Sequence, residues 1–296
     1  MAQPIEKWKR LPWENSSPAE MFCLLVDHWE KLSAFSEPLF NNVGAVIEFV
    51  FHSNLAEGAE VDEGATRRLI HDAVGTQPLS EAQPMLIACN DMQSPAADTR
   101  HGHARRFVLQ HLNALMFVRE LGPTDLTPDT LKRLHEVLMQ GLQGADEDAV
   151  FVPGEFRTEG CRATGIAGRN VQYLDHEKIP EAIDTLLRDV AEKMRQLEPL
   201  GQLTPDAFYL AAELLVRFLA IHPFGDGNGR VARLLVHWVL HHHGFSLPLT
   251  LVKGKYSKAK RHYLQVLDAV QHKDQPVSKA ATFILSHTLH AIESYA

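Results

Sequence analysis

The sequence predicts an all-α protein, and two observations lead to this expectation. Apolar residues recur with helical spacing along most of the chain, whereas runs of strict alternation are few. Several of the periodic segments also begin with a capping side chain directly before a proline, which is a typical helix start. The 296 residues, 45% hydrophobic and 22% charged, are enough to bury a sizeable core.

Ten segments are predicted as helices from this periodicity. In chain order they span residues 18–35, 43–56, 62–74, 104–121, 128–142, 180–197, 205–221, 229–243, 255–270 and 277–294. Ser17, Thr127 and Thr204 each precede a first-turn proline and are the expected caps of three of them. Gly58 is a natural stop for the second helix. Val236, Trp238 and their neighbours make the helix at 229–243 a core helix.

The exception to the helical pattern is the segment 153–175, where glycines at 154, 160, 165 and 168 interrupt short extended pieces. It is interpreted as a hairpin or an irregular flap between helices. A stretch at 93–99 with a mild shift in composition separates an N-terminal helical region, 1–95, from the rest of the chain, 96–296. No internal repeat is found.

The composition excludes several classes of function. A formal net charge of −8 disfavours wholesale nucleic-acid binding. No apolar run has the length of a membrane span, and residues 1–9 contain no hydrophobic signal core. Cys23, Cys89 and Cys161 are odd in number and far apart, which argues against a disulfide framework or a zinc site. We therefore expect a cytoplasmic protein without membrane or nucleic-acid partners.

The segment 221–233 holds the densest group of residues suited to phosphate chemistry. Its glycines and Asn228 leave backbone N–H groups free to surround an anion, and the helix that follows points its positive end at the same place. Arg230 and Arg233 are three residues apart, so they share a helix face and can both bind a polyphosphate. The aspartate offers a hard oxygen ligand for Mg²⁺, and the histidine can take a proton near neutral pH. These four side chains belong to His222, Asp226, Arg230 and Arg233.

The residues from His222 to Arg233, in full His-Pro-Phe-Gly-Asp-Gly-Asn-Gly-Arg-Val-Ala-Arg, resemble without a mismatch the HPFx(D/E)GNGRxxR signature of the Fic (Fido) family. This resemblance implies a Fic-type helical bundle with a short β-hairpin flap near the active site. It also implies transfer of AMP from ATP to a Ser, Thr or Tyr hydroxyl of a target protein. The partners are then ATP and that target. Dimers are common in the family, so a homodimer is included by analogy.

The same resemblance assigns roles within the signature. The general base would be His222, the Mg²⁺ ligand would be Asp226, and Phe224 would anchor the loop in the core. The anion hole would be formed by Gly227, Asn228 and Gly229, with a hydrogen bond from the Asn228 side chain. The β- and γ-phosphates would be neutralised by Arg230 and Arg233 respectively.

A second motif lies upstream, where the residues from Ser53 to Gly58 fit the family's (S/T)xxxE(G/N) pattern. In a helix, Ser53 and Glu57 are one turn apart on one face. The resemblance implies an inhibitory helix whose Glu57 pairs with Arg233 and so displaces the γ-phosphate. It also allows Glu57 to position a water that removes AMP from a modified target. The alternative is a plain helix end with Glu57 in water.

The flap begins with Gly-Glu-Phe-Arg-Thr at residues 154–158, similar to the G-x-[FY]-R start of the family's target-docking segment. Arg157, Thr158 and Cys161 are therefore expected to face the target. The residues that follow are more polar and richer in glycine than is usual, and the double proline before the next helix is absent. Nothing near Cys161 in the sequence clearly lowers its pKa.

Tyr263 is the candidate for a position beside the adenine, and an ordinary core aromatic explains the same pattern. His237 and His241 have the spacing of metal ligands, but the glutamate of an HExxH motif is missing, so they are interpreted as a polar stripe on a core helix. Two further functions stay open. The chain could transfer another nucleotide or phosphate-linked group, or it could be a catalytically idle interaction module.

Overall fold

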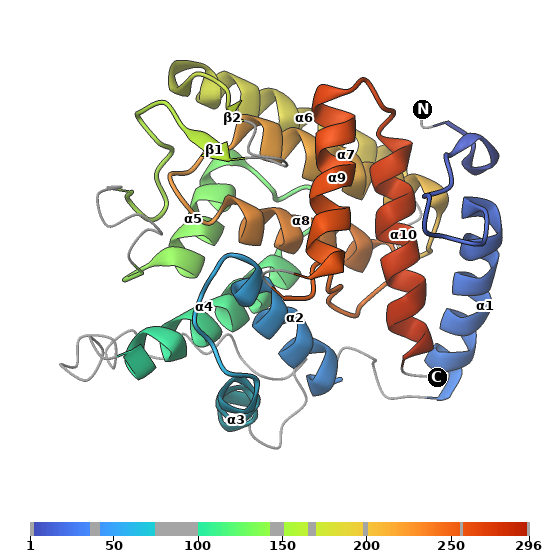
Figure 1. The fold of residues 1–296 in the computed structure, drawn as a ribbon, viewed down its shortest axis with the longest axis horizontal. Coiled ribbons are helices and arrows are strands. Elements are labelled where there is room, and N and C mark those ends of the chain that lie inside the picture. Colours follow the sequence, from blue (N-terminus) through green and yellow to red (C-terminus); the bar gives the residue numbers. More distant parts are fainter. Residues whose placement is uncertain are drawn as a thin grey trace.

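The computed structural model describes residues 3–35, 42–74, 100–142, 151–164, 170–197, 201–254 and 257–294, and these residues form an almost wholly helical fold (Figure 1). The α-helices are α1 (Pro18–Phe35), α2 (Val43–Ala56), α3 (Glu63–Val74), α4 (Arg100–Glu120), α5 (Pro128–Met139), α6 (Ile179–Gln196), α7 (Pro205–Ile221), α8 (Asn228–His242), α9 (Lys258–His272) and α10 (Ser278–Glu293). Strands β1 (Arg162–Thr164) and β2 (Asn170–Gln172) form one antiparallel hairpin, with Ala163 opposite Val171. The expected all-α fold with a hairpin flap is confirmed.

All ten predicted helices are present, and their ends lie within four residues of the predicted bounds. The predicted start of the ninth, at 255, lies outside the described residues. The three expected caps are confirmed: the hydroxyls of Ser17, Thr127 and Thr204 accept hydrogen bonds from the N–H groups of the residues three positions later. These helix ends therefore follow from local hydrogen bonding.

The core is built around α7 and α8, which lie side by side in the middle of the molecule (Figure 1). Buried residues occur all round α8, including Val231, Leu234, Leu235 and Trp238. A helix that is apolar all round belongs in a protein interior. The loop between α7 and α8 is therefore held by packed elements at both of its ends.

The N-terminal helices α2 and α3 pack against α4, and α1 packs against α10 (Figure 1). The end of α2 thus reaches the same side of the molecule as α8 and α9. The stretch 93–99 lies outside the described residues, and the division at residue 95 stays a prediction. No helix in the described ranges has the length and apolar character needed to cross a membrane.

Candidate active site

The loop from residue 222 to residue 227 joins α7 to α8 and is fastened to the core by Phe224, which is fully buried as expected. Asn228, the first residue of α8, binds this anchor with both polar atoms of its side chain. Its Oδ1 accepts the N–H of Phe224 at 3.0 Å, and its Nδ2 donates to the carbonyl of Phe224 at 2.8 Å. The Asn228 side chain therefore braces the loop. This role was not expected from the sequence, and a hydrogen bond from the second N–H of Nδ2 to a phosphate stays a prediction.

His222 is the first residue after α7 and has a φ of +52°, in the left-handed region. Its ring stacks on that of Tyr173, with centroids 3.8 Å apart and planes 10° from parallel. Burial lowers the pKa of His222 to about 4, so the imidazole is neutral at pH 7. The pKa of His222 thus lies below the near-neutral value expected from the sequence, and a neutral imidazole is the form that a general base needs.

Asp226 is the partly exposed carboxylate of the loop. Its Oδ1 accepts the N–H of Gly227 at 2.6 Å, while its Oδ2 has a long contact of 3.9 Å to Arg230. No cluster of three or more metal-ligating side chains occurs in the part of the chain that the structure describes. Mg²⁺ commonly binds one or two carboxylates together with substrate phosphates, and a single partly exposed carboxylate just before the N-terminus of α8 fits that mode.

Arg233 is 3% exposed and is held by the end of α2. Its Nη2 donates to Glu57 Oε1 at 2.7 Å, and its Nε donates to Ser53 Oγ at 2.8 Å. Gly58, with a φ of +89°, follows directly and lets the chain turn away from the helix, as expected. The predicted Glu57–Arg233 contact is therefore present, and Glu57 does not lie free in water.

The charge of Glu57 is stabilised where it lies. Burial raises the pKa of this carboxyl, but the positive charges of Arg233, Arg230 and Lys260 outweigh burial and leave the pKa below its usual value. Glu57 is therefore ionised at neutral pH and places a negative charge beside Arg233.

Two further residues, Asn54 and Lys260, tether the same end of α2, and sequence reasoning did not single out either. Asn54 is fully buried, and its Nδ2 donates to the carbonyl of Phe107 on α4 while its Oδ1 lies 3.2 Å from His111 Nδ1. Lys260 of α9 donates to the carbonyl of Ala56. No motif spacing signals these contacts, because they join residues more than fifty positions apart.

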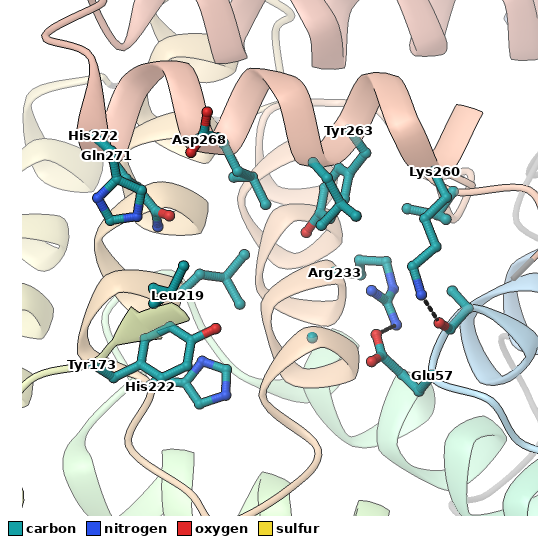
Figure 2. A pocket seen from close by; sticks show the side chains of 16 residues that line it. Glu57, Tyr173, Leu219, His222, Arg233, Lys260, Tyr263, Asp268, Gln271 and His272 are labelled. Atoms are coloured by element: carbon teal, nitrogen blue, oxygen red, sulfur yellow. Dashed lines mark hydrogen bonds and ion pairs between the residues drawn. The ribbon is translucent and has the colours of Figure 1, made fainter. Parts of the chain in front are cut away.

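Glu57, His222 and Arg233 line a cavity of about 210 Å³ between the loop, the flap and α9. Figure 2 shows Tyr173 and His222 on one side of it, Glu57 and Arg233 on the other, and α9 along a third. Tyr263 of α9 lines the cavity and is buried, and burial raises the pKa of its phenol to about 12. Its contact with an adenine stays a prediction. Further along α9, the lining includes three residues that the sequence analysis did not name, Asp268, Gln271 and His272.

Arg157, at the root of the flap, holds backbone carbonyls instead of facing outward. Its Nε donates to the carbonyl of His222 at 2.8 Å, and its other nitrogens donate to the carbonyls of Glu159 and Leu174. The expected target contact of this side chain is corrected to a structural one that joins the flap to the loop between α7 and α8.

The other two flap residues expected to face the target differ in exposure. Thr158 is exposed, whereas Cys161 is partly buried, and burial raises the pKa of the Cys161 thiol. A raised pKa disfavours the reactive thiolate. Gly165 and Gly168 lie outside the described residues.

The fold and the site together define a helical protein with a glycine-containing loop at the start of a buried helix. The Fic/DOC family model matches residues 125–240. A Fido domain-containing protein of Dictyostelium discoideum is 34% identical over 113 residues, which are 38% of this chain and 76% of that protein. The chain belongs to the Fic/DOC family. Glu57 and Tyr263 both lie outside the residues that the family model matches.

Two other similarities extend this finding. The crystal structure of a Fic domain-containing signaling protein from Bacteroides thetaiotaomicron shares the fold, with a TM-score of 0.66 at 22% identity over 92% of this chain and 94% of that one. A uridine 5′-monophosphate transferase of Xanthomonas campestris is 26% identical over 157 residues, which cover 48% of this chain. The chain spans only 28% of the length of that transferase.

Proposed function

We propose that this protein is an adenylyltransferase that uses ATP and Mg²⁺ to transfer AMP to a Ser, Thr or Tyr hydroxyl of a target protein. The observation that carries the proposal is that His222, Gly229 and Arg233 line one cavity at the N-terminal end of α8. A base, a helix N-terminus and a cation are thereby brought to one small space, which suits a reaction at a phosphate.

In this mechanism the target hydroxyl oxygen attacks the α-phosphorus of ATP, and the bond from that phosphorus to the β-phosphate oxygen breaks. Pyrophosphate leaves, and the neutral His222 takes the hydroxyl proton. Backbone N–H groups at the start of α8 and the guanidinium of Arg233 hold the phosphates. Arg230 is 2% exposed, so its positive charge acts from within the protein. Asp226 would hold Mg²⁺, which would neutralise part of the negative charge of the phosphates.

Glu57 restrains this reaction in the proposed scheme. Its carboxylate engages Arg233 at 2.7 Å and lines the same cavity as His222. Arg233 is then not free to orient a γ-phosphate, and a negative charge lies where the phosphates need to bind. The same placement supports a second candidate, in which Glu57 holds a water that removes AMP from a modified target.

The test is labelling with α-³²P-ATP in the presence of MgCl₂, which compares wild type, Glu57→Gly and the double variant Glu57→Gly with His222→Ala. We expect strong self-labelling or target labelling by Glu57→Gly, and none by the double variant. Replacement of His176, which lies outside the cavity, by Ala in the Glu57→Gly background is the matched control and should keep the label.

Parallel reactions with α-³²P-UTP address the similarity to the uridine 5′-monophosphate transferase. A stronger label from UTP than from ATP would replace adenylyl transfer by uridylyl transfer. Absence of label from either nucleotide in every variant would overturn the proposal in favour of an idle interaction module.

A further inference from the structure

We infer that His135 of α5 is a positioning residue that holds both the metal-binding turn of the loop and the root of the flap. The part that concerns Mg²⁺ rests on the proposed function. The ring of His135 is fully buried and lies between two backbone segments that are far apart in the sequence. No motif in the sequence pointed to it, because its partner Asp226 lies 91 positions away.

The hydrogen bonds of His135 assign its tautomer. The N–H of Gly154 donates to His135 Nδ1 at 2.9 Å, so this nitrogen carries no proton. In a neutral ring the proton is then on Nε2, which donates to the carbonyl oxygen of Asp226 at 3.0 Å. Burial lowers the pKa of His135 to about 4, which agrees with a neutral ring at pH 7.

The bond to Asp226 acts on the side chain of that residue through the backbone. The carbonyl of Asp226 and the N–H of Gly227 belong to the same planar peptide group, so holding one fixes the direction of the other. That N–H donates to Asp226 Oδ1 at 2.6 Å. His135 therefore sets the orientation of the carboxylate, and Oδ2, whose contact with Arg230 is long at 3.9 Å, is the oxygen that would face a cation.

Packing against α5 reinforces this arrangement. The ring of His135 stacks on that of Phe224, with centroids 3.7 Å apart and planes 2° from parallel. Gly227 has a φ of +78°, and a side chain there would collide with Met139 of α5 at 2.8 Å. One helix thus contacts three loop residues, Phe224, Asp226 and Gly227, and only glycine fits at the last of these.

The two hydrogen bonds can be separated by two substitutions. In His135→Asn, the amide oxygen lies near the position of Nδ1, so the bond from Gly154 is kept and the bond to Asp226 is lost. In His135→Gln, the amide nitrogen lies near the position of Nε2, so the bond to Asp226 is kept and the bond from Gly154 is lost. Each variant is therefore the matched control for the other.

The first measurement is amide hydrogen exchange, which requires no nucleotide. We expect the Gly227 amide to exchange about tenfold faster in His135→Asn but not in His135→Gln, since a lost hydrogen bond is worth roughly that factor. The Gly154 amide should show the opposite behaviour. Equal exchange of both amides in the two variants would overturn the inference. General loosening of the fold would speed both amides together and would also count against it.

The second measurement is binding of a fluorescent ATP analogue during a titration with MgCl₂, in the Glu57→Gly background. Loss of a group that orients a metal ligand commonly weakens metal binding by about tenfold or more. We expect His135→Asn to raise the half-saturating Mg²⁺ concentration by about that factor, and His135→Gln to leave it within about twofold. Binding in EDTA should be the same in both variants. An unshifted Mg²⁺ midpoint in His135→Asn would overturn the metal role.

The two measurements distinguish two kinds of failure. If no variant binds the analogue, the proposed function fails, whereas the exchange of the Gly227 and Gly154 amides still decides whether His135 holds the two segments.

Discussion

The carboxylate of Glu57 and the guanidinium of Arg233 form an ion pair of 2.7 Å between residues 176 positions apart. The same carboxylate lies directly over Gly229, at the start of α8, where a Cβ atom would collide with Glu57 Oε1. Glu57 therefore occupies the space that the helix N-terminus and the arginine would otherwise offer to an anion.

Replacing Glu57 by Gln should reduce stability at pH 7 but not in acid. The pKa of Glu57 is lower in the folded protein than in the unfolded chain, so its stabilising effect is complete above the ordinary glutamate range. It disappears as the pH falls through the lowered folded value. Because the side chain is 32% exposed, we expect a loss of only about 1 kcal/mol. Urea unfolding of both proteins from pH 7 to pH 3 measures this, and a constant difference across that range would contradict it.

Replacing Gly229 by Ala should lower the free energy of unfolding only when Glu57 is present. In the wild-type background the new methyl group meets the Glu57 carboxylate, which can move aside only by giving up its contact with Arg233, at a cost of about 1 kcal/mol. In the Glu57→Gly background the collision is gone, and alanine is the better helix former. A double-mutant cycle of unfolding free energies should therefore give a coupling of at least about 1 kcal/mol. Additive effects would show that the carboxylate does not lie against Gly229.

The labelling rate of Glu57→Gly should fall only in strongly acidic solution. His222 accepts a proton in the reaction, and its pKa is lowered to about 4 by burial. The base is therefore in its active form throughout the neutral range and is lost as the pH falls through about 4. Rates at saturating nucleotide from pH 8 to pH 4 test this. A midpoint near the ordinary histidine value of 6.5 would mean that the ring is solvated in the working enzyme.

Replacing Arg157 by Lys should destabilise the protein, whereas the same change at Arg162 should have little effect. The guanidinium of Arg157 spans several carbonyls at once, including that of His222, and an ammonium group cannot reach them together. Leaving these acceptors unpaired should cost about 1–3 kcal/mol in unfolding free energy. Arg162 is an exposed arginine of the same flap and is the matched control. Equal urea midpoints for the two variants would show that Arg157 is not a structural anchor.

Much of the fold could be predicted because its causes are local. The caps at Thr127 and Thr204 depend on residues three positions away, and the helix ends followed them. The Glu57–Arg233 contact is long-range, yet it was expected because each partner belongs to a motif of the family that the chain resembles. Sequence patterns misassigned or missed the roles of Arg157, Asn228 and His135. The side chains of these residues bind backbone groups, and a sequence pattern does not show which backbone groups lie nearby.

The sequence by itself determined the ten helices, the contiguous loop from His222 to Arg233 and the kinds of chemistry that its side chains allow, because periodicity, capping and residue type act over a few positions. Only the tertiary structure decided that the imidazole of His222 is neutral, since its pKa depends on burial by distant elements. It also decided which groups Asn228 and Arg157 bind, and that the carboxylate of Glu57 lies over Gly229, since these are contacts that the chain makes only when packing brings remote segments together.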